Sequence, residues 1–145
     1  GLNSLYLAMQ NPSGRVFSIE GSTELSQFAS GLAAGLNVNN INFINENFTT
    51  AIPQIPTDLQ EPLLVYFDGD HSCAATLDYF SKMLPFARDN NVFVFDDIYW
   101  SEGMTRAWKE ISSHPLVSLS IDTFYTGYIF FTGNIRQKVS YRFSI

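Results

Sequence analysis

Residues 63–68 read LLVYFD and residues 92–97 read VFVFDD, and these two stretches decide the fold. Each is an almost unbroken apolar run that ends on aspartate, which is typical of a β-strand buried on both faces of a sheet. A helical pattern follows each run, SCAATLDYFSKMLPFA after the first and SEGMTRAWKEISSH after the second. Two such strand and helix pairs predict a parallel α/β sheet with these strands near its centre.

The same alternation continues toward the N-terminus. A helical pattern at residues 2–9 precedes the β-rich run RVFSIE, and a second helix, capped by Ser22 or Thr23, precedes the strand INFIN at 41–45. Residues 49–62 are interrupted by prolines and are expected to be a connector with at most a short helix. The alternation therefore extends over the N-terminal half of the chain.

Three shorter β-like runs follow at residues 117–122, 128–131 and 139–145. Gly133 and Asn134 predict a turn between the last two runs, and so an antiparallel hairpin at the C-terminal edge of the sheet. The fold class predicted from these patterns is a mainly parallel α/β sheet that ends in an antiparallel hairpin. No repeat or linker interrupts it, so we expect a single domain over residues 1–145.

Composition excludes several classes of protein. Of the 145 residues, 46% are hydrophobic and 15% are charged, which excludes a disordered chain and a coiled coil. The net charge of −6 disfavours a nucleic-acid partner. The sequence has neither a long apolar span nor a secretory pattern, and Cys73 has no second cysteine to pair with. We therefore predict a soluble, cytoplasmic protein that binds no membrane.

Polar residues stand at the ends of four predicted strands. Ligands of open parallel sheets bind outside the carboxyl ends of the strands, so these are the candidate site residues. Any one of them could instead be a helix cap or part of a solvated turn. The four groups are Glu20; Asn45 with Glu46 and Asn47; Asp68 with Asp70 and His71; and Asp96 with Asp97.

Glu20 stands about 20 residues after Gly1, the spacing at which dinucleotide-binding folds place an acid that binds ribose hydroxyls. The glycine-rich turn that accompanies such an acid would have to lie just before Leu2, where this sequence has only Gly1. One acid at this spacing is a weak signal by itself.

Asp68, Asp96 and Asp97 end the two most apolar runs, where three unpaired carboxylates would be costly to bury. A divalent cation such as Mg²⁺ or Ca²⁺ would compensate their charge. The alternative is that Asp97 caps the following helix and Asp68 accepts from a loop amide. His71, next to Asp70, is a candidate general base or else a solvated loop residue.

Four segments together resemble the class I S-adenosylmethionine-dependent methyltransferases, in particular the small-molecule O-methyltransferase-like branch. GLNSLYLA resembles the helix after the cofactor loop, and RVFSIEGS resembles the second strand with its ribose-binding acid. LLVYFDGDHSCAATLDYF resembles the fourth strand and its helix, and VFVFDDIYWSEGM resembles the fifth. The C-terminal runs look like the family's closing hairpin.

This resemblance implies a Rossmann-like sheet with helices on both faces, without the family's first strand and glycine-rich loop. It implies transfer of a methyl group to an oxygen of a small molecule. Without the first strand, apolar strand edges would be exposed and favour pairing with another chain, so we expect a homodimer. The implied cofactor is S-adenosylmethionine, with Mg²⁺ or another divalent cation where metal is used. The implied roles are cofactor binding for Gly1, Glu20, Asn47 and Asp68; metal binding for Asp68, Asp96 and Asp97; and catalysis for His71 and Asp70.

Asp97 departs from the family pattern, because the metal-dependent members resembled here hold asparagine at that position. The sequence as given is expected to be N-terminally truncated relative to the family. Two other readings stay open. One is a non-catalytic, degenerate methyltransferase-fold domain that acts through self-association. The other is a metal-dependent hydrolase or phosphoryl-transfer enzyme acting through the clustered aspartates, which no P-loop or nucleophile motif supports.

Overall fold

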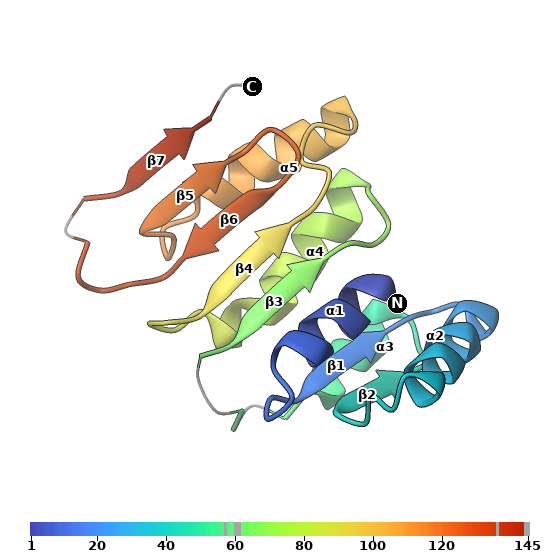
Figure 1. Cartoon of the computed structure of the whole chain (residues 1–145). Coiled ribbons are helices and arrows are strands. Elements are labelled where there is room, and N and C mark those ends of the chain that lie inside the picture. The colour runs from blue at the N-terminus through green and yellow to red at the C-terminus, as the bar shows by residue number, and fades with distance from the viewer. Residues whose placement is uncertain (57, 60–61, 136, 144–145) are drawn as a thin grey trace. The chain divides into compact units, whose positions relative to one another are not determined.

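The structure is a computed structural model, and it describes residues 1–56, 58–59, 62–135 and 137–143. The chain folds as two compact units, residues 1–56 and residues 57–145. Each unit has its own sheet, one of two strands and one of five (Figure 1). That the two units together make up a single domain stays a prediction.

The first unit is a parallel strand pair with its helices. Its elements are α1 (Leu2–Gln10), β1 (Val16–Ile19), α2 (Thr23–Gly35), β2 (Ile41–Ile44), the short α3 (Phe48–Ala51) and the 3₁₀ turn η1 (Ile52–Gln54). The Ser22 hydroxyl accepts from the Leu25 backbone N–H and begins α2, as its sequence predicts. Small side chains such as Ala8, Ala29 and Ala33 are buried, which lets the helices pack closely.

The second unit is a five-stranded sheet with two main helices. Its elements are β3 (Leu64–Phe67), α4 (Cys73–Met83), η2 (Leu84–Phe86), β4 (Val92–Phe95), α5 (Glu102–Ser113), β5 (Leu119–Asp122), β6 (Gly127–Phe130) and β7 (Val139–Arg142). The strand order is β3-β4-β6-β5-β7. β3 pairs parallel with β4, and β5 pairs parallel with β7, whereas β6 runs antiparallel to both of its neighbours.

The C-terminal hairpin is present but uses other strands than the sequence indicated. β5 and β6 form the antiparallel pair, and the chain turns between them at residues 123–126. The Gly133–Asn134 turn does not join paired strands, because β7 passes β6 and pairs parallel with β5. Residues 144–145 of the expected last strand lie outside the described residues.

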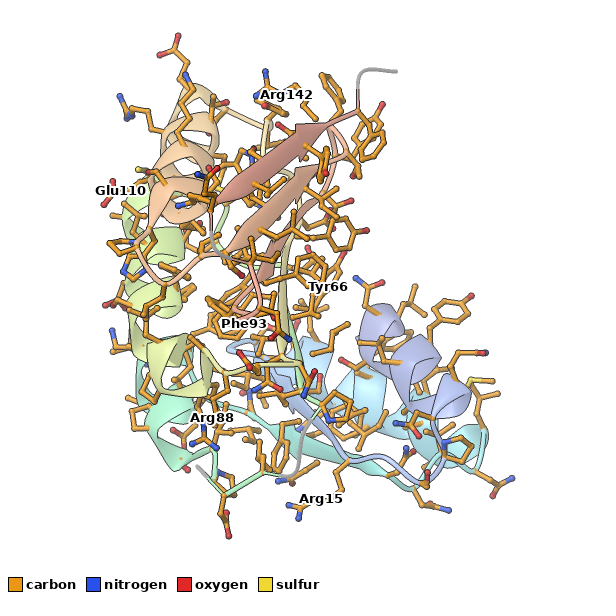
Figure 2. The ribbon with its side chains drawn as sticks, turned by 90° about the vertical axis from the view of Figure 1, so that its left-hand side faces the viewer. Arg15, Tyr66, Arg88, Phe93, Glu110 and Arg142 are labelled. Carbon is orange, nitrogen blue, oxygen red and sulfur yellow. The ribbon has the colours of Figure 1, made fainter. Side chains whose placement is uncertain are left out.

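The core of the second unit is aromatic and lies between the sheet and one helical layer. Figure 2 shows α4 and α5 on the same face of this sheet, with Phe93 directed toward them. Phe93 and Phe95 from β4 contact Phe80 on α4, and Phe95 also approaches Trp108 on α5. Burying each such ring stabilises the fold by roughly 1.5–3 kcal/mol. This layer fixes the carboxyl ends of β3 and β4.

The two apolar runs that define the fold have different places in the sheet. β4 is an inner strand, between β3 and β6, and its Phe93, Val94 and Phe95 are buried, as predicted. β3 is an edge strand whose Leu64 is exposed, so its predicted central position is wrong in this structure. An apolar strand sequence indicates that both faces of the strand are covered. It does not indicate whether a second strand pairs with its other edge.

The mixed α/β fold with mostly parallel pairing is confirmed, since three of the five strand pairs are parallel. Among the described residues, none of the helices has the length and apolar character needed to cross a membrane.

Candidate active site

Glu20 directly follows β1, at the carboxyl end of the parallel pair. Its backbone N–H still bonds to the Ile44 carbonyl at 3.0 Å, which extends the strand pairing by one residue. Its Oε1 accepts from the Ser22 backbone N–H at 2.8 Å. The other oxygen, Oε2, has no hydrogen-bond partner among the described residues. Glu20 is therefore held in place by one carboxylate oxygen and can offer the second to a hydroxyl group.

The side chains of Asn45 and Asn47 both form hydrogen bonds with the backbone near the ends of β1 and β2. Asn45 donates from Nδ2 to the Glu20 carbonyl at 2.8 Å, so it ties the end of β2 to the end of β1. Asn47 is the N-cap of α3, where its Oδ1 accepts from the Thr50 backbone N–H at 3.0 Å. Its predicted place near an adenine stays a prediction, and only its amide Nδ2 would be available for that role.

Gly1 is the N-cap of α1, and its carbonyl accepts from the Leu5 backbone N–H at 3.2 Å. A Cβ at this position would collide with the side chain of Ala29 on α2. Gly1 therefore lets the start of α1 approach α2 closely. The structure gives this packing reason for the glycine, and its predicted cofactor role stays a prediction.

Three of the predicted residues meet beyond the ends of β3 and β4. Nε2 of His71 lies 3.8 Å from Oδ1 of Asp68 and 3.8 Å from Oδ2 of Asp97. The histidine side chain is 30% exposed and the two carboxylates 43% and 38%, so the cluster is open to solvent. A protonated imidazole here would face two carboxylates.

Asp96 lies next to this cluster but points to another partner. Its Oδ2 accepts from the Tyr66 hydroxyl at 2.9 Å, and its Oδ1 accepts from the Asp97 backbone N–H at 3.0 Å. Burial raises the pKa of Tyr66 well above its ordinary value, and the bond to Asp96 and the charges of Asp96 and Asp68 raise it further. Tyr66 therefore stays a hydrogen-bond donor to Asp96 throughout the physiological range.

The predicted metal ligands do not fit a shared cation. Both oxygens of Asp96 accept hydrogen bonds from protein groups, and the remaining pair, Asp68 and Asp97, flanks an imidazole. Across the part of the chain that the structure describes, no group of three or more histidine, cysteine, aspartate or glutamate side chains is arranged to hold a metal ion.

Asp70 is not brought to His71 as a partner, because the ion-pair partners of the imidazole in the described chain are Asp68 and Asp97. Burial raises the pKa of Tyr79 on α4, and the negative charge of Asp70 raises it further. The charge of Asp70 therefore acts on Tyr79. Asp70 and Asp97 both have φ of 53°, a left-handed conformation that is uncommon for residues other than glycine. Such strain gathers at functional sites more often than elsewhere.

Ser101 caps α5 through its hydroxyl, which accepts from the Met104 backbone N–H at 3.1 Å. The alternative in which Asp97 caps this helix is therefore wrong. Trp100, which follows the aspartate pair, is 72% exposed, whereas Trp108 is buried in the core. Of these two tryptophans, only Trp100 presents its ring to solvent near the strand ends.

Sequence reasoning missed two residues at this end of the sheet. The sequence presents Tyr66 only as part of an apolar strand, because its bond to Asp96 depends on the register between β3 and β4. Asp122 also ends a β-like run, so the rule that singled out the other strand ends applies to it as well. It is 4% exposed and accepts from Tyr99 and Arg142.

Comparison with known proteins finds one matching family and a solved structure of similar fold. A family described as "Methyltransferase domain" matches residues 2–98. A crystal structure of the O-methyltransferase from Bacillus cereus in complex with SAH superposes with a TM-score of 0.62 at 23% identity, over 80% of this chain. The chain spans 61% of the length of that protein. No curated protein matches the sequence.

The likeness to the Bacillus cereus structure is one of fold, and it agrees with a Rossmann-like methyltransferase architecture. The family match covers about two thirds of the sequence, from the start of α1 through the end of β4 and the aspartate pair that follows it. The chain therefore belongs to this family of methyltransferase domains.

Proposed function

We propose that this protein transfers a methyl group from S-adenosylmethionine to an oxygen atom of a small molecule. The family match carries the proposal, because the matched residues 2–98 include every predicted site residue except Gly1. The likeness in fold to an O-methyltransferase that was crystallised with SAH supports oxygen as the acceptor atom.

Glu20 is the residue that we propose for the cofactor ribose. Its Oε1 is fixed by the Ser22 N–H, so Oε2 can accept from a ribose hydroxyl without reorganising the turn. A hydrogen bond to a charged group contributes about 1.5–3 kcal/mol, enough for one such contact to matter for affinity. Asn47, with its amide Nδ2, is proposed for the adenine, and Asp68 for the methionine part.

S-adenosylmethionine supplies an electrophilic methyl group on its sulfonium sulfur when it is bound. The contribution of the chain would be to hold the acceptor hydroxyl in line and to take up its proton at Nε2 of His71. Asp68 and Asp97 would then face the imidazolium that forms, each at 3.8 Å. Positioning of this kind accounts for about 7–11 kcal/mol in intramolecular reactions.

The proposal contains no divalent cation, because Asp96 is bonded to Tyr66 and the other two carboxylates flank His71. Asp70 is not proposed as a base, since His71 is paired with other carboxylates. The proposed partner is thus a small-molecule methyl acceptor, and neither a nucleic acid nor a membrane is part of the proposal. We propose a cytoplasmic location on the sequence pattern, and a homodimer because exposed apolar strand edges favour pairing with another chain.

Incubation with S-adenosylmethionine labelled in its methyl group tests the proposal, with a panel of hydroxylated small molecules as acceptors. Label transferred to an oxygen of one acceptor by the wild type, and reduced in His71→Ala, would support it. A folded protein that binds neither the cofactor nor its demethylated product, and that light scattering finds as a stable dimer, would favour the non-catalytic alternative.

A further inference from the structure

The imidazole of His71 stands at the point where the carboxylates of Asp68 and Asp97 converge, with Nε2 3.8 Å from one oxygen of each. These two aspartates were predicted as ligands of a divalent cation. We propose that His71 fills the place where a cation would bridge Asp68 and Asp97, so that the strand ends of this protein hold an imidazole there and exclude the cation.

The first argument is the space between the two carboxylates. Mg²⁺ binds oxygen at about 2.0–2.1 Å and Ca²⁺ at about 2.3–2.6 Å, so a bridging cation must lie close to both aspartates. The edge of the imidazole ring already lies within ion-pair distance of both. A cation with its remaining water ligands could enter only after the ring had moved away.

The second argument is the number of oxygen ligands. Ca²⁺ takes 6–8 oxygens, and Mg²⁺ is held in proteins by one or two carboxylates with several waters around it. Asp96 is directed to other partners, because its two oxygens accept from the Tyr66 hydroxyl and the Asp97 N–H. Among the described residues, no group of three or more histidine, cysteine, aspartate or glutamate side chains is arranged around a common point for a metal ion.

The third argument is that the backbone on both sides of His71 is fixed. Asp70 adopts a left-handed conformation with φ of 53°, and Ser72 caps α4 by accepting from the Ala75 N–H at 3.4 Å. The carbonyl of Asp70 also accepts from the Ser72 N–H. His71 therefore leaves the loop between two constrained residues, in the direction of Asp68 and Asp97.

This inference stands apart from the proposed methyl transfer, because it concerns only which group occupies the space between two carboxylates. It assigns His71 a role in ligand selection: the imidazole makes the cluster unsuitable for a divalent cation. Asp97 stands where the metal-dependent members of the resembled family hold asparagine, and it gives the imidazole a second carboxylate to face.

Binding of Mn²⁺ to the full chain, followed by the loss of the electron paramagnetic resonance signal of the free ion, tests the inference. We expect no specific binding to the wild type at millimolar Mn²⁺. We expect His71→Ala to bind one Mn²⁺ per chain at least about tenfold more tightly than the wild type. The double variant Asp68→Asn with His71→Ala should lose this gain.

Circular dichroism establishes that each variant is folded before its binding is compared. Two results would overturn the inference. The first is specific Mn²⁺ binding to the wild type that His71→Ala abolishes, since the imidazole would then be a metal ligand. The second is a folded His71→Ala variant that binds no more Mn²⁺ than the wild type does. Transfer of a labelled methyl group from S-adenosylmethionine by the wild type, measured separately, decides the proposed function whichever metal result is found.

Discussion

Asp122 at the end of β5 accepts a hydrogen bond of 2.9 Å from Nε of Arg142 at the end of β7, and this pair ties the last strand to the sheet. Oδ2 of Asp122, which accepts this bond, also accepts from the Tyr99 hydroxyl at 2.6 Å. Oδ1 of Asp122 accepts from the Phe124 N–H at 3.0 Å. The guanidinium of Arg142 also bonds to the Tyr99 hydroxyl. One buried aspartate thus connects β5, β7 and the turn between β5 and β6.

The first prediction concerns acid stability. Burial alone would raise the pKa of Asp122, but the bonds from Tyr99, Phe124 and Arg142 outweigh it and hold the pKa below its ordinary 3.8. A depressed pKa in the folded state contributes stability above pH 3.8, and this is lost as the pH falls through the folded value. We expect Asp122→Asn to lower the free energy of unfolding by about 1.5–3 kcal/mol at neutral pH.

Urea unfolding followed by tryptophan fluorescence measures this effect, since Trp100 and Trp108 both lie in the second unit. Ser140→Ala is the matched control on β7, because it removes the neutral bond of 3.0 Å to Ser120. The control should cost about 0.5–1.5 kcal/mol and keep the wild-type acid dependence. If Asp122→Asn kept that dependence too, Asp122 would not be the group that titrates.

The second prediction concerns alkaline stability. Burial first, and then the bond to Asp96, raise the pKa of Tyr66 above its ordinary 10.0. A raised pKa contributes stability that is complete below pH 10.0 and is lost as the pH rises through the folded value. Tyr66→Phe should therefore cost about 1.5–3 kcal/mol at neutral pH and reduce the loss of stability in strong alkali.

Ultraviolet titration of the tyrosines should show one late-ionising group fewer in Tyr66→Phe. Tyr125→Phe is the control, because Tyr125 is exposed and its hydroxyl accepts and donates no bond among the described residues. Its stability should stay within about 0.5 kcal/mol of the wild type. An unchanged late-ionising group in Tyr66→Phe would contradict the assignment.

The third prediction concerns the packing of α5 on the sheet. A Cβ at Gly127 would lie 2.5 Å from two ring carbons of Trp108, which is itself buried at 4% exposure. Gly127→Ala must move either the indole or β6, and overpacking of this kind costs about 1–3 kcal/mol. Gly31→Ala on α2 is the counterpart, since a Cβ there meets nothing within 4 Å. It should stabilise α2 by about 0.5–1 kcal/mol.

Thermal unfolding of both glycine variants gives the comparison. A Gly127→Ala protein as stable as the wild type would mean that Trp108 can leave its place against β6 at little cost.

The fourth prediction concerns the cofactor. Glu20→Gln keeps an acceptor for the Ser22 N–H but removes the charge offered to a ribose hydroxyl. Affinity for S-adenosylhomocysteine should fall by about 1.5–3 kcal/mol, which is roughly 10-fold or more. Glu24→Gln, an exposed change in the first turn of α2, should leave the affinity unchanged. Equal affinities for the two variants would remove Glu20 from the binding site.

Much of the fold follows from local pattern. Ser22 begins α2 where a capping residue stands before an apolar periodic stretch, and β4 is buried because VFVF leaves no polar face. The place of β7 could not be predicted in this way. β6 pairs with one edge of β5, and β7 pairs with the other. The bond between Arg142 and Asp122 that accompanies this pairing joins residues 20 positions apart, so no local pattern indicates it.

The candidate site was predicted in part. The rule that strand ends carry the site residues brought Asp68, His71 and Asp97 into consideration, and the structure brings these three together. Sequence proximity suggested Asp70 as the partner of His71, but the left-handed turn at Asp70 directs the imidazole to the other two carboxylates. The partner of Asp96 was missed because Tyr66 lies 30 residues earlier, on the neighbouring strand.

Isothermal titration of S-adenosylhomocysteine into the folded wild-type chain tests the methyltransferase assignment most directly. Saturable binding at one molecule per chain, weakened by Glu20→Gln and not by Glu24→Gln, is the result that the account predicts. A chain that is folded by circular dichroism and takes up no S-adenosylhomocysteine would contradict it.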